Sequence, residues 1–273
     1  MITLLFIGDI VGRPGRLLVR RGLPALVAAH GVDLVIVNVE NAAAGFGITP
    51  DLADEMLEAG VHVMTGGNHT WDKKEILPYL DREPRLIRPA NMPPGVPGRG
   101  HYIARTASGI SVGVINVMGR VFMTAIDDPF RAVLAEIDLV RKDAAVILVD
   151  MHAEATSEKI AMGWHLDGRA TVVVGTHTHV QTADERVLPH GTAYITDVGM
   201  TGPHDSVIGV ERVPILHRFL TALPQRFETA TENPRLNGVL VLADETTGKA
   251  IAITRISLSL DDLDALPPPA LAR

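Results

Sequence analysis

The sequence contains no cysteine, so neither disulfide bonds nor zinc sites built on thiolates can stabilise this protein. Any bound metal must therefore be held by nitrogen and oxygen atoms. The sequence also lacks a block of basic residues. It contains 25 Lys and Arg and 32 Asp and Glu, which gives a net charge of −7. We expect no stable binding of duplex nucleic acid, whereas a single nucleotide held through metal ions is compatible with this charge.

Long apolar runs are absent as well. No stretch approaches the roughly 20 residues needed to cross a bilayer, and the apolar N-terminus lacks the basic region and cleavage site of a signal peptide. We expect a cytoplasmic protein that does not bind membranes. With 47% apolar and 21% charged residues, the composition is that of a globular protein. The length allows one large α/β domain or two small ones, and we expect a single domain over residues 1–273 with a peripheral tail from about residue 261.

Short apolar runs rich in Val and Ile alternate with helical patterns. The predicted strands, which should be buried on both faces, are Ile2–Ile7, Leu34–Val39, Val61–Thr65, Val112–Val117, Ala145–Met151 and Thr171–Val174. The predicted helices are Leu17–Ala29, Pro50–Ala59, Lys73–Leu80 and Phe130–Arg141. This alternation predicts an α/β fold. Gly238–Ala243 and Ala250–Leu258 flank a turn and should form a hairpin that adds to a second sheet packed on the first.

Polar residues that could bind a metal follow the ends of these strands. They are Asp9, Glu40, Asn41, Asn68, His69, His152, His177 and His179. Because the carboxyl ends of strands in an open α/β sheet converge on one crevice, we expect one site from residues spread over some 170 positions. Taken singly, Asp and Asn after a strand often cap helices, and a lone His is usually structural. Capping does not explain the combination of a Glu-Asn pair, an Asn-His pair and a His-x-His pair.

The spacing of the last pair favours two metal ions rather than one. On an extended segment His177 and His179 point to the same side, so each can reach one of two neighbouring ions. Two-metal sites hold their ions about 3.5 to 4 Å apart, and a carboxylate between them makes this proximity tolerable. Glu40 is the candidate for this bridge.

Six segments resemble the calcineurin-like metallophosphoesterases, and within them the small bacterial cyclic-nucleotide phosphodiesterases of the YmdB-like group. The segments are GDIVGRPGR (8–16), NVENAAAGFGIT (38–49), TGGNHTWD (65–72), DMHAEATSEK (150–159), VGTHTHVQTAD (174–184) and TDVGMTGPHDSVIG (196–209). The resemblance implies a four-layer α-β-β-α sandwich, in which two mixed sheets are flanked by helices. It also implies an active site with two transition-metal ions.

Residue roles follow from the resemblance position by position. The first metal would be bound by Asp9, Glu40, Asn41 and His179, and the second by Glu40, Asn68, His152 and His177. A hydroxide between the metals would attack phosphorus in line, and His69 would protonate the leaving oxygen. Two patterns of the wider superfamily are missing: D-x-H at Asp9, and G-D-x-x-D where Glu40 and Asn41 stand. The bacterial group shares these departures. Asn41 would therefore replace the usual Asp as a ligand. Asp150 or Asp72 would support the ligands, with a surface or capping role as the alternative.

The resemblance also implies the cofactors and the substrate. Iron or manganese is expected, while zinc or cobalt also suits imidazole, carboxylate and amide ligands. The substrates would be 2′,3′-cyclic nucleotides, with 3′,5′-cyclic AMP as a further candidate. Met200, Thr201 and His204 either line the pocket or belong to a glycine-rich turn without substrate contact. We also expect a homo-oligomer.

Two other functions are compatible with parts of the sequence. The same two-metal site could hydrolyse phosphomonoesters, as a nucleotidase does. Alternatively, the chain could be a non-catalytic nucleotide-binding regulator of the Rossmann type. Gly8, Gly12 and Gly15 do not match the G-x-G-x-x-G pattern of that fold, however, and it does not account for the His-x-His pair.

Overall fold

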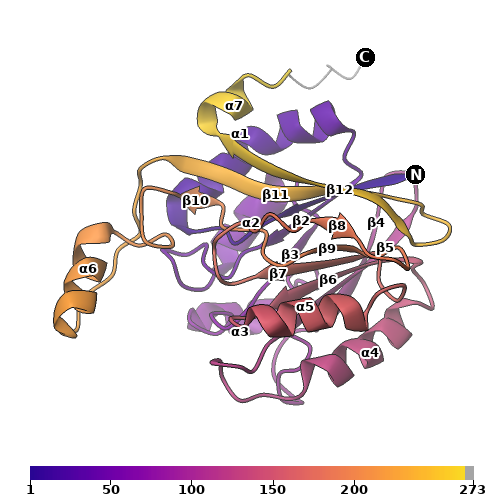
Figure 1. Cartoon of the computed structure of the whole chain (residues 1–273), viewed down its shortest axis with the longest axis horizontal. Coiled ribbons are helices and arrows are strands. Elements are labelled where there is room, and N and C mark those ends of the chain that lie inside the picture. The colour runs from indigo at the N-terminus through magenta and orange to yellow at the C-terminus, as the bar shows by residue number, and fades with distance from the viewer. Residues whose placement is uncertain (268–273) are drawn as a thin grey trace.

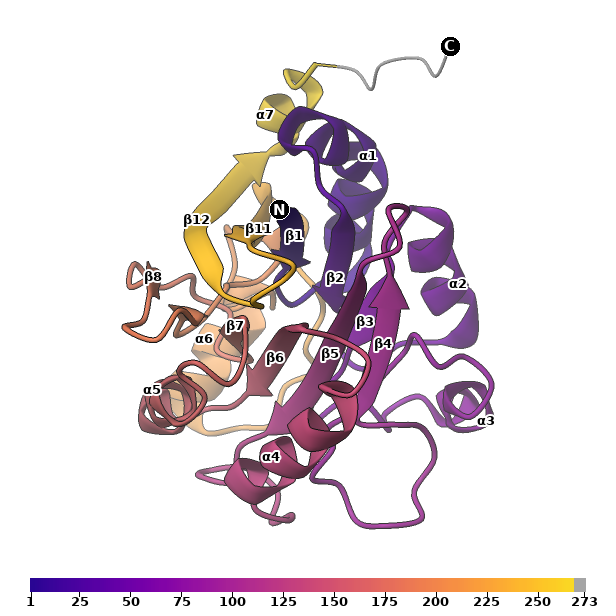
Figure 2. The same cartoon turned by 90° about the vertical axis from the view of Figure 1, so that its right-hand side faces the viewer.

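A computed structural model describes residues 1–267, which form two six-stranded sheets with helices on their outer faces (Figures 1 and 2). The first sheet has the order β10-β11-β1-β2-β3, and β12 pairs with β11. Its strands are β1 (Ile2–Ile7), β2 (Leu34–Asn38), β3 (Val63–Thr65), β10 (Gly202–Pro203), β11 (Pro234–Ala243) and β12 (Ala250–Ser259). Strands β1, β2 and β3 run parallel, whereas β11 is antiparallel to β1.

The second sheet has the order β4-β5-β6-β7-β9-β8. Its strands are β4 (His101–Arg105), β5 (Ser111–Met118), β6 (Val146–His152), β7 (Val172–Thr176), β8 (Arg186–Val187) and β9 (Ala193–Ile195). Strands β5, β6, β7 and β9 are parallel to one another. Both sheets therefore combine parallel and antiparallel strands, and this mixed character confirms the predicted sandwich.

Most of the helices cover the two outer faces (Figure 2), whereas α6 (Arg212–Thr221) projects from the body (Figure 1). The others are α1 (Gly12–His30), α2 (Pro50–Glu58), the 3-10 turn η1 (Lys74–Ile76), α3 (Leu77–Leu80), α4 (Pro129–Val140), α5 (Thr156–His165) and α7 (Leu260–Asp264). Two of them start as their sequences indicate. Thr49 and Asp128 cap the first turns of α2 and α4 through their side chains, and each cap is followed by a proline.

Three apolar layers explain why the central strands are apolar throughout. In β1, Leu4 and Phe6 face the core between the two sheets, whereas Leu5 and Ile7 face the core under α1 and α2. A third core lies between the second sheet and the helices α4 and α5. Since side chains alternate along a strand, a strand buried on both faces is apolar over most of its length. The first polar side chains after such strands therefore appear at one edge of the sandwich.

The predicted hairpin of Gly238–Ala243 and Ala250–Leu258 forms, with a first strand that begins earlier, at Pro234, but its predicted sheet was wrong. Strand β11 pairs with β1 along its length, from Ile2 opposite Ala243 to Ile7 opposite Gly238, so the hairpin extends the first sheet. The alternation within β11 suits either sheet, and only long-range pairing selects the partner. The second sheet is instead formed by β4 to β9.

Other differences concern elements with weak local signals. Helices α5 and α6 were not predicted, nor were the short strands β4, β8, β9 and β10. The segment expected to be peripheral begins with α7, whose Leu263 is buried against Gly22 of α1. The end of that segment, residues 268–273, lies outside the described residues. Within residues 1–267, no helix is long and apolar enough to span a membrane.

Candidate metal centre

The polar residues that follow the strands meet at one edge of the sandwich. Asp9 follows β1, Glu40 and Asn41 follow β2, and Asn68 and His69 follow β3. From the second sheet come His152, at the end of β6, and His177 and His179, which follow β7. The site is therefore shared between two sheets, whereas the strand pattern alone suggested the edge of one.

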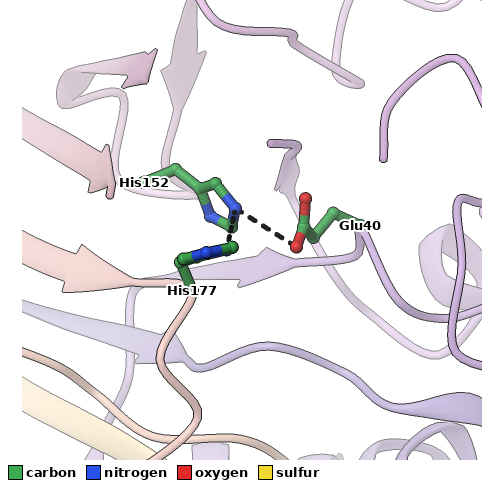
Figure 3. A group of neighbouring side chains, drawn as sticks. All are labelled: Glu40, His152 and His177. Carbon is green, nitrogen blue, oxygen red and sulfur yellow. Dashed lines mark hydrogen bonds and ion pairs between the residues drawn. The ribbon is translucent and has the colours of Figure 1, made fainter. Parts of the chain in front are cut away.

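His152 lies at the centre of the first group of possible ligands. Its Nε2 atom is 3.1 Å from Glu40 Oε1, 3.1 Å from His177 Nδ1 and 3.0 Å from Asn68 Oδ1. Figure 3 shows the three side chains of Glu40, His152 and His177 pointing toward one another, and their ligand atoms lie within 4.8 Å. Such a convergence of nitrogen and oxygen atoms is what a metal ion requires.

The remaining residues form a second group beside the first. Asp9 Oδ1 is 3.9 Å from His179 Nε2 and 4.0 Å from His152 Nδ1. The amide nitrogen of Asn41 is 3.1 Å from His179 Nε2 and 3.1 Å from Glu40 Oε1. Glu40 thus contacts members of both groups. The structure brings all seven predicted ligand residues together.

The environment of Asp9 shows whether these residues fit a metal. Its Oδ1 atom is buried and has no hydrogen-bond partner among residues 1–267. Burial raises the pKa of Asp9 to about 6, against the opposing effect of His179 and His152. A buried carboxylate oxygen without a donor is costly, and a cation removes this cost. Carboxylate, imidazole and amide oxygen together suit a transition-metal ion, so the residues present fit the expected metal.

The charges within the cluster are strongly coupled. Burial of His152 opposes its charged form, but the neighbouring Glu40 outweighs this and raises the pKa of His152 to about 9. Burial likewise opposes ionisation of Glu40, yet His152 holds the pKa of Glu40 well below its usual value. Burial and the charge on His152 lower the pKa of His177 to about 3. A metal that binds His152 must therefore displace a proton from it.

A chain of hydrogen bonds behind His152 orients its ring. The Thr176 hydroxyl donates to Asp150 Oδ1 at 2.7 Å, so its oxygen accepts from His152 Nδ1 at 2.8 Å. Asp150 is fully buried and its other oxygen accepts from Thr65 and Asn38. The Nδ1–H of His152 is thereby engaged, which leaves Nε2 directed at Glu40 and available to a metal.

The loop that carries His177 and His179 is fixed by residues that the sequence did not reveal. Both histidines have left-handed backbones, with φ of 95° and 65°, which is unfavourable for residues other than glycine. Between them, the amide and hydroxyl of Thr178 donate to Asp197 Oδ2 at 3.1 and 2.5 Å. The same oxygen accepts from Lys159 Nζ at 2.7 Å, and both charged side chains are buried. The one signal for Lys159 and Asp197 in the sequence was that both lie within the segments that resemble the metallophosphoesterases.

Gly67 is required beside the cluster for steric reasons. A Cβ atom on this residue would lie 2.2 Å from Glu40 Oε2 and 2.4 Å from His152 Nε2. Real Cβ atoms do not approach other atoms this closely, so any other residue would force the two side chains apart. The glycine lets the loop after β3 bring Asn68 next to His152.

His69 lies at the rim rather than inside the cluster. Its Nδ1 atom is 2.8 Å from Asp72 Oδ2, and its main-chain N–H donates to Glu40 Oε2 at 3.1 Å. The imidazole is 27% exposed, and the ring of Phe46 packs against it edge-on. The side chain is thus anchored to the cluster through its backbone and remains accessible to solvent.

The two residues predicted to contact substrate have different surroundings. Thr201 is buried, and its hydroxyl donates to the carbonyl oxygen of Asn237 at 3.1 Å. His204 lines a cavity of about 490 Å³ together with Met200 and His179. Burial lowers the pKa of His204. Of these two residues, only His204 lines the cavity.

Comparisons with known proteins agree with this architecture. A sandwich of two mixed sheets with the cluster at its edge is the metallophosphoesterase type of fold. The chain belongs to the YmdB-like family, whose model matches residues 5–256. It is 49% identical over 262 residues to a 2′,3′-cyclic-nucleotide 2′-phosphodiesterase of Bacillus subtilis, which covers 96% of this chain and 99% of that protein.

Solved structures are similar over nearly the whole chain. A hypothetical protein from Thermus thermophilus has a TM-score of 0.87 and 43% identity, and covers 94% of this chain and 99% of its own. A novel phosphatase from Mycoplasma pneumoniae has a TM-score of 0.88 and 36% identity, with 94% and 93% covered. Because the named relatives are phosphodiesterases or phosphatases, the chain is a phosphoric-ester hydrolase.

Proposed function

We propose that this protein is a metal-dependent phosphodiesterase that opens 2′,3′-cyclic nucleotides at a centre of two transition-metal ions. The observation that carries the proposal is the convergence of Glu40, His152 and His177, whose ligand atoms lie within 4.8 Å of one another. The named activity of the Bacillus subtilis relative supports the substrate class. The neighbouring Asp9, with its unpartnered carboxylate oxygen, supports a second ion.

The ligand sets of the proposal overlap at one residue. Asp9, Glu40, Asn41 and His179 would hold one ion, and Glu40, Asn68, His152 and His177 the other. The contacts of Glu40 Oε1 with both Asn41 and His152 support its bridging role. Rotation of the Asn41 amide would present its oxygen in place of its nitrogen. Iron or manganese is proposed, and zinc or cobalt suits the same donors.

The metals and the protein side chains contribute different parts of the chemistry. When bound, the ions act as Lewis acids toward the phosphoryl oxygens and lower the pKa of water to produce a nucleophile at neutral pH. His177 is held against Glu154 through Nε2 at 3.1 Å, which leaves Nδ1 facing His152. The hydrogen bond to Thr176 orients the imidazole of His152, and the bond from Thr178 to Asp197 fixes the loop between His177 and His179, so the cluster is organised before substrate arrives.

His69 is proposed to complete the reaction by supplying a proton. Hydrolysis adds water across the bond between phosphorus and the ribose 2′ oxygen, and this oxygen must be protonated as it leaves. Asp72 accepts the Nδ1–H of His69, which directs the Nε2 atom to act as the donor. The exposure of the imidazole allows it to recover a proton from solvent after each turnover.

The cavity beside His179 is proposed to hold the nucleoside. Its volume of about 490 Å³ lies within the range of small-molecule sites, and His204, Met200 and Ile208 line it. Burial lowers the pKa of His204. Its Nδ1 atom contacts the Gly202 carbonyl at 3.0 Å and its Nε2 atom contacts the Asn237 amide at 3.2 Å, so the imidazole would contact the base through its ring face. Thr201 would contribute indirectly by holding Asn237 in the wall of this cavity.

Metal removal and reconstitution test the proposal. Protein stripped with a chelator should not hydrolyse 2′,3′-cyclic AMP, and addition of Mn²⁺ or Fe²⁺ should restore release of the 3′-monophosphate. Parallel assays with 3′,5′-cyclic AMP and AMP measure the preference for the substrate and address phosphomonoesterase activity. Full activity in metal-free protein, or faster hydrolysis of AMP than of the cyclic nucleotide, would overturn the proposal.

A further inference from the structure

Helix α6 projects from the body of the molecule, at the left of Figure 1. None of its ten residues is buried against any part of the chain that the structure describes. Val213, Phe219 and Leu220 are 78%, 74% and 84% exposed. We call residues 211–228 the arm, since the N–H of Glu211 donates to the carbonyl of Glu228 at 2.9 Å and closes its base.

The helix in the arm cannot owe its stability to its own sequence. Isolated helices shorter than about 12 to 15 residues are marginal in water, and α6 has ten residues and no side-chain cap at its start. Most helices are stabilised by packing of an apolar face, yet the apolar face of α6 is in contact with solvent. Exposed apolar side chains gathered in this way mark an interaction site. The arm therefore requires a surface outside its own chain.

The charge of the arm indicates which surface this is. Between Glu211 and Glu228 the arm contains Arg212, Arg218 and Arg226 and no acidic residue, while the whole chain has a net charge of −7. These three arginines complement the acidic remainder of this same chain, whereas two arms packed on each other would bring arginines together. A second copy is also the one partner that is present whenever the protein is. Reciprocal exchange of arms is the closed, symmetric form of such a contact.

We infer that the arm is a dimerisation element, with α6 of each copy packed on the body of a second copy. Five large apolar side chains are offered by each arm, namely Val213, Leu216, Phe219, Leu220 and Leu223. Exchanged in both directions, they suit an interface of the usual ~800 Å² per partner. Ile208, three residues before the arm begins, contacts the candidate metal centre, since its carbonyl accepts from His179 Nδ1 at 2.8 Å.

Measurement of mass in solution tests this inference. The intact chain at micromolar concentration should have at least twice the monomer mass of 29.3 kDa by light scattering. The double variant Phe219→Glu/Leu220→Glu should have the monomer mass, because it places charge in the interface without touching the core. The control Leu139→Glu/Ile251→Glu adds the same two charges at apolar residues of the body that are 49% and 51% exposed, and it should remain associated.

Two results would overturn the inference: an intact chain that is monomeric, or an arm variant that stays associated. Hydrogen exchange provides a readout that requires no variant. Amides 212–221 of the intact chain should become more protected as protein concentration rises, and rapid exchange at every concentration would also overturn it. Neither measurement involves metal or substrate, so their failure leaves the proposed phosphodiesterase activity untouched.

Discussion

The metal centre and the arm break the ordinary rules of burial in opposite directions. At the centre, charged and polar groups are removed from water: Asp9 and His152 are fully buried, and Glu40 is only 2% exposed. In the arm, apolar side chains such as Leu220 are left in water. Buried charges without partners and exposed apolar groups without partners are both costly. Each region therefore implies something that completes it, an ion in the first and a second chain in the second.

Loss of the carboxylate proposed to bridge the two metals should have the largest effect. Glu40→Gln removes the negative charge shared by both ligand groups, so we expect loss of bound metal and a fall in kcat/KM of about 10³-fold or more, since metal ions contribute several kcal/mol. Elemental analysis and hydrolysis of 2′,3′-cyclic AMP check both. The control Glu58→Gln, at an exposed position of α2, should leave both unchanged. Full metal content in Glu40→Gln would contradict a bridging role.

Removal of His69 should separate proton transfer from metal binding. His69→Ala should lower kcat by about 10² to 10⁴-fold, the usual contribution of a general acid, while metal content stays at the level of the intact protein. The control His30→Ala alters a histidine at the exposed end of α1 and should change neither kcat nor metal content. Equal loss of metal and turnover in His69→Ala would identify it as a ligand instead.

The buried pair behind the His-x-His loop should matter mainly for stability. Asp197→Asn leaves Lys159 charged and buried without its partner, which typically costs about 3 to 5 kcal/mol in the free energy of unfolding. Thermal unfolding of the metal-free protein measures this loss. The double variant Lys159→Met/Asp197→Asn removes both charges and should recover part of it. A single variant as stable as the intact protein would show that the pair does not support the loop.

Apolar truncation should have its smallest effect in the arm. Leu220→Ser, at a position 84% exposed, should change the free energy of unfolding by less than about 0.5 kcal/mol when the protein is diluted to monomer. The same measurement on Leu236→Ala, which is fully buried, should show a loss of about 2 to 5 kcal/mol. A loss at Leu220 as large as that at Leu236 would mean that the arm packs within its own chain.

Much of the centre could be predicted from sequence because strands buried on both faces end abruptly in polar residues. This local signal located β1, β2, β5, β6 and β7 and the residues that follow them. The sheet to which the hairpin belongs could not be predicted, since β11 pairs with β1 over a separation of more than 200 residues. The contact of Lys159 with Asp197 depends on α5 packing against β7, which no local pattern encodes. Helix α6 has apolar residues at helical spacing, but they do not pack on the core of the described chain.

Anomalous diffraction from crystals of the metal-loaded protein tests the central claim most directly. We predict two metal peaks per chain, about 3.5 to 4 Å apart, with Glu40 between them. Asp9, Asn41 and His179 should surround one peak, and Asn68, His152 and His177 the other. Metal peaks located away from these residues, or none in protein that hydrolyses 2′,3′-cyclic AMP, would contradict it.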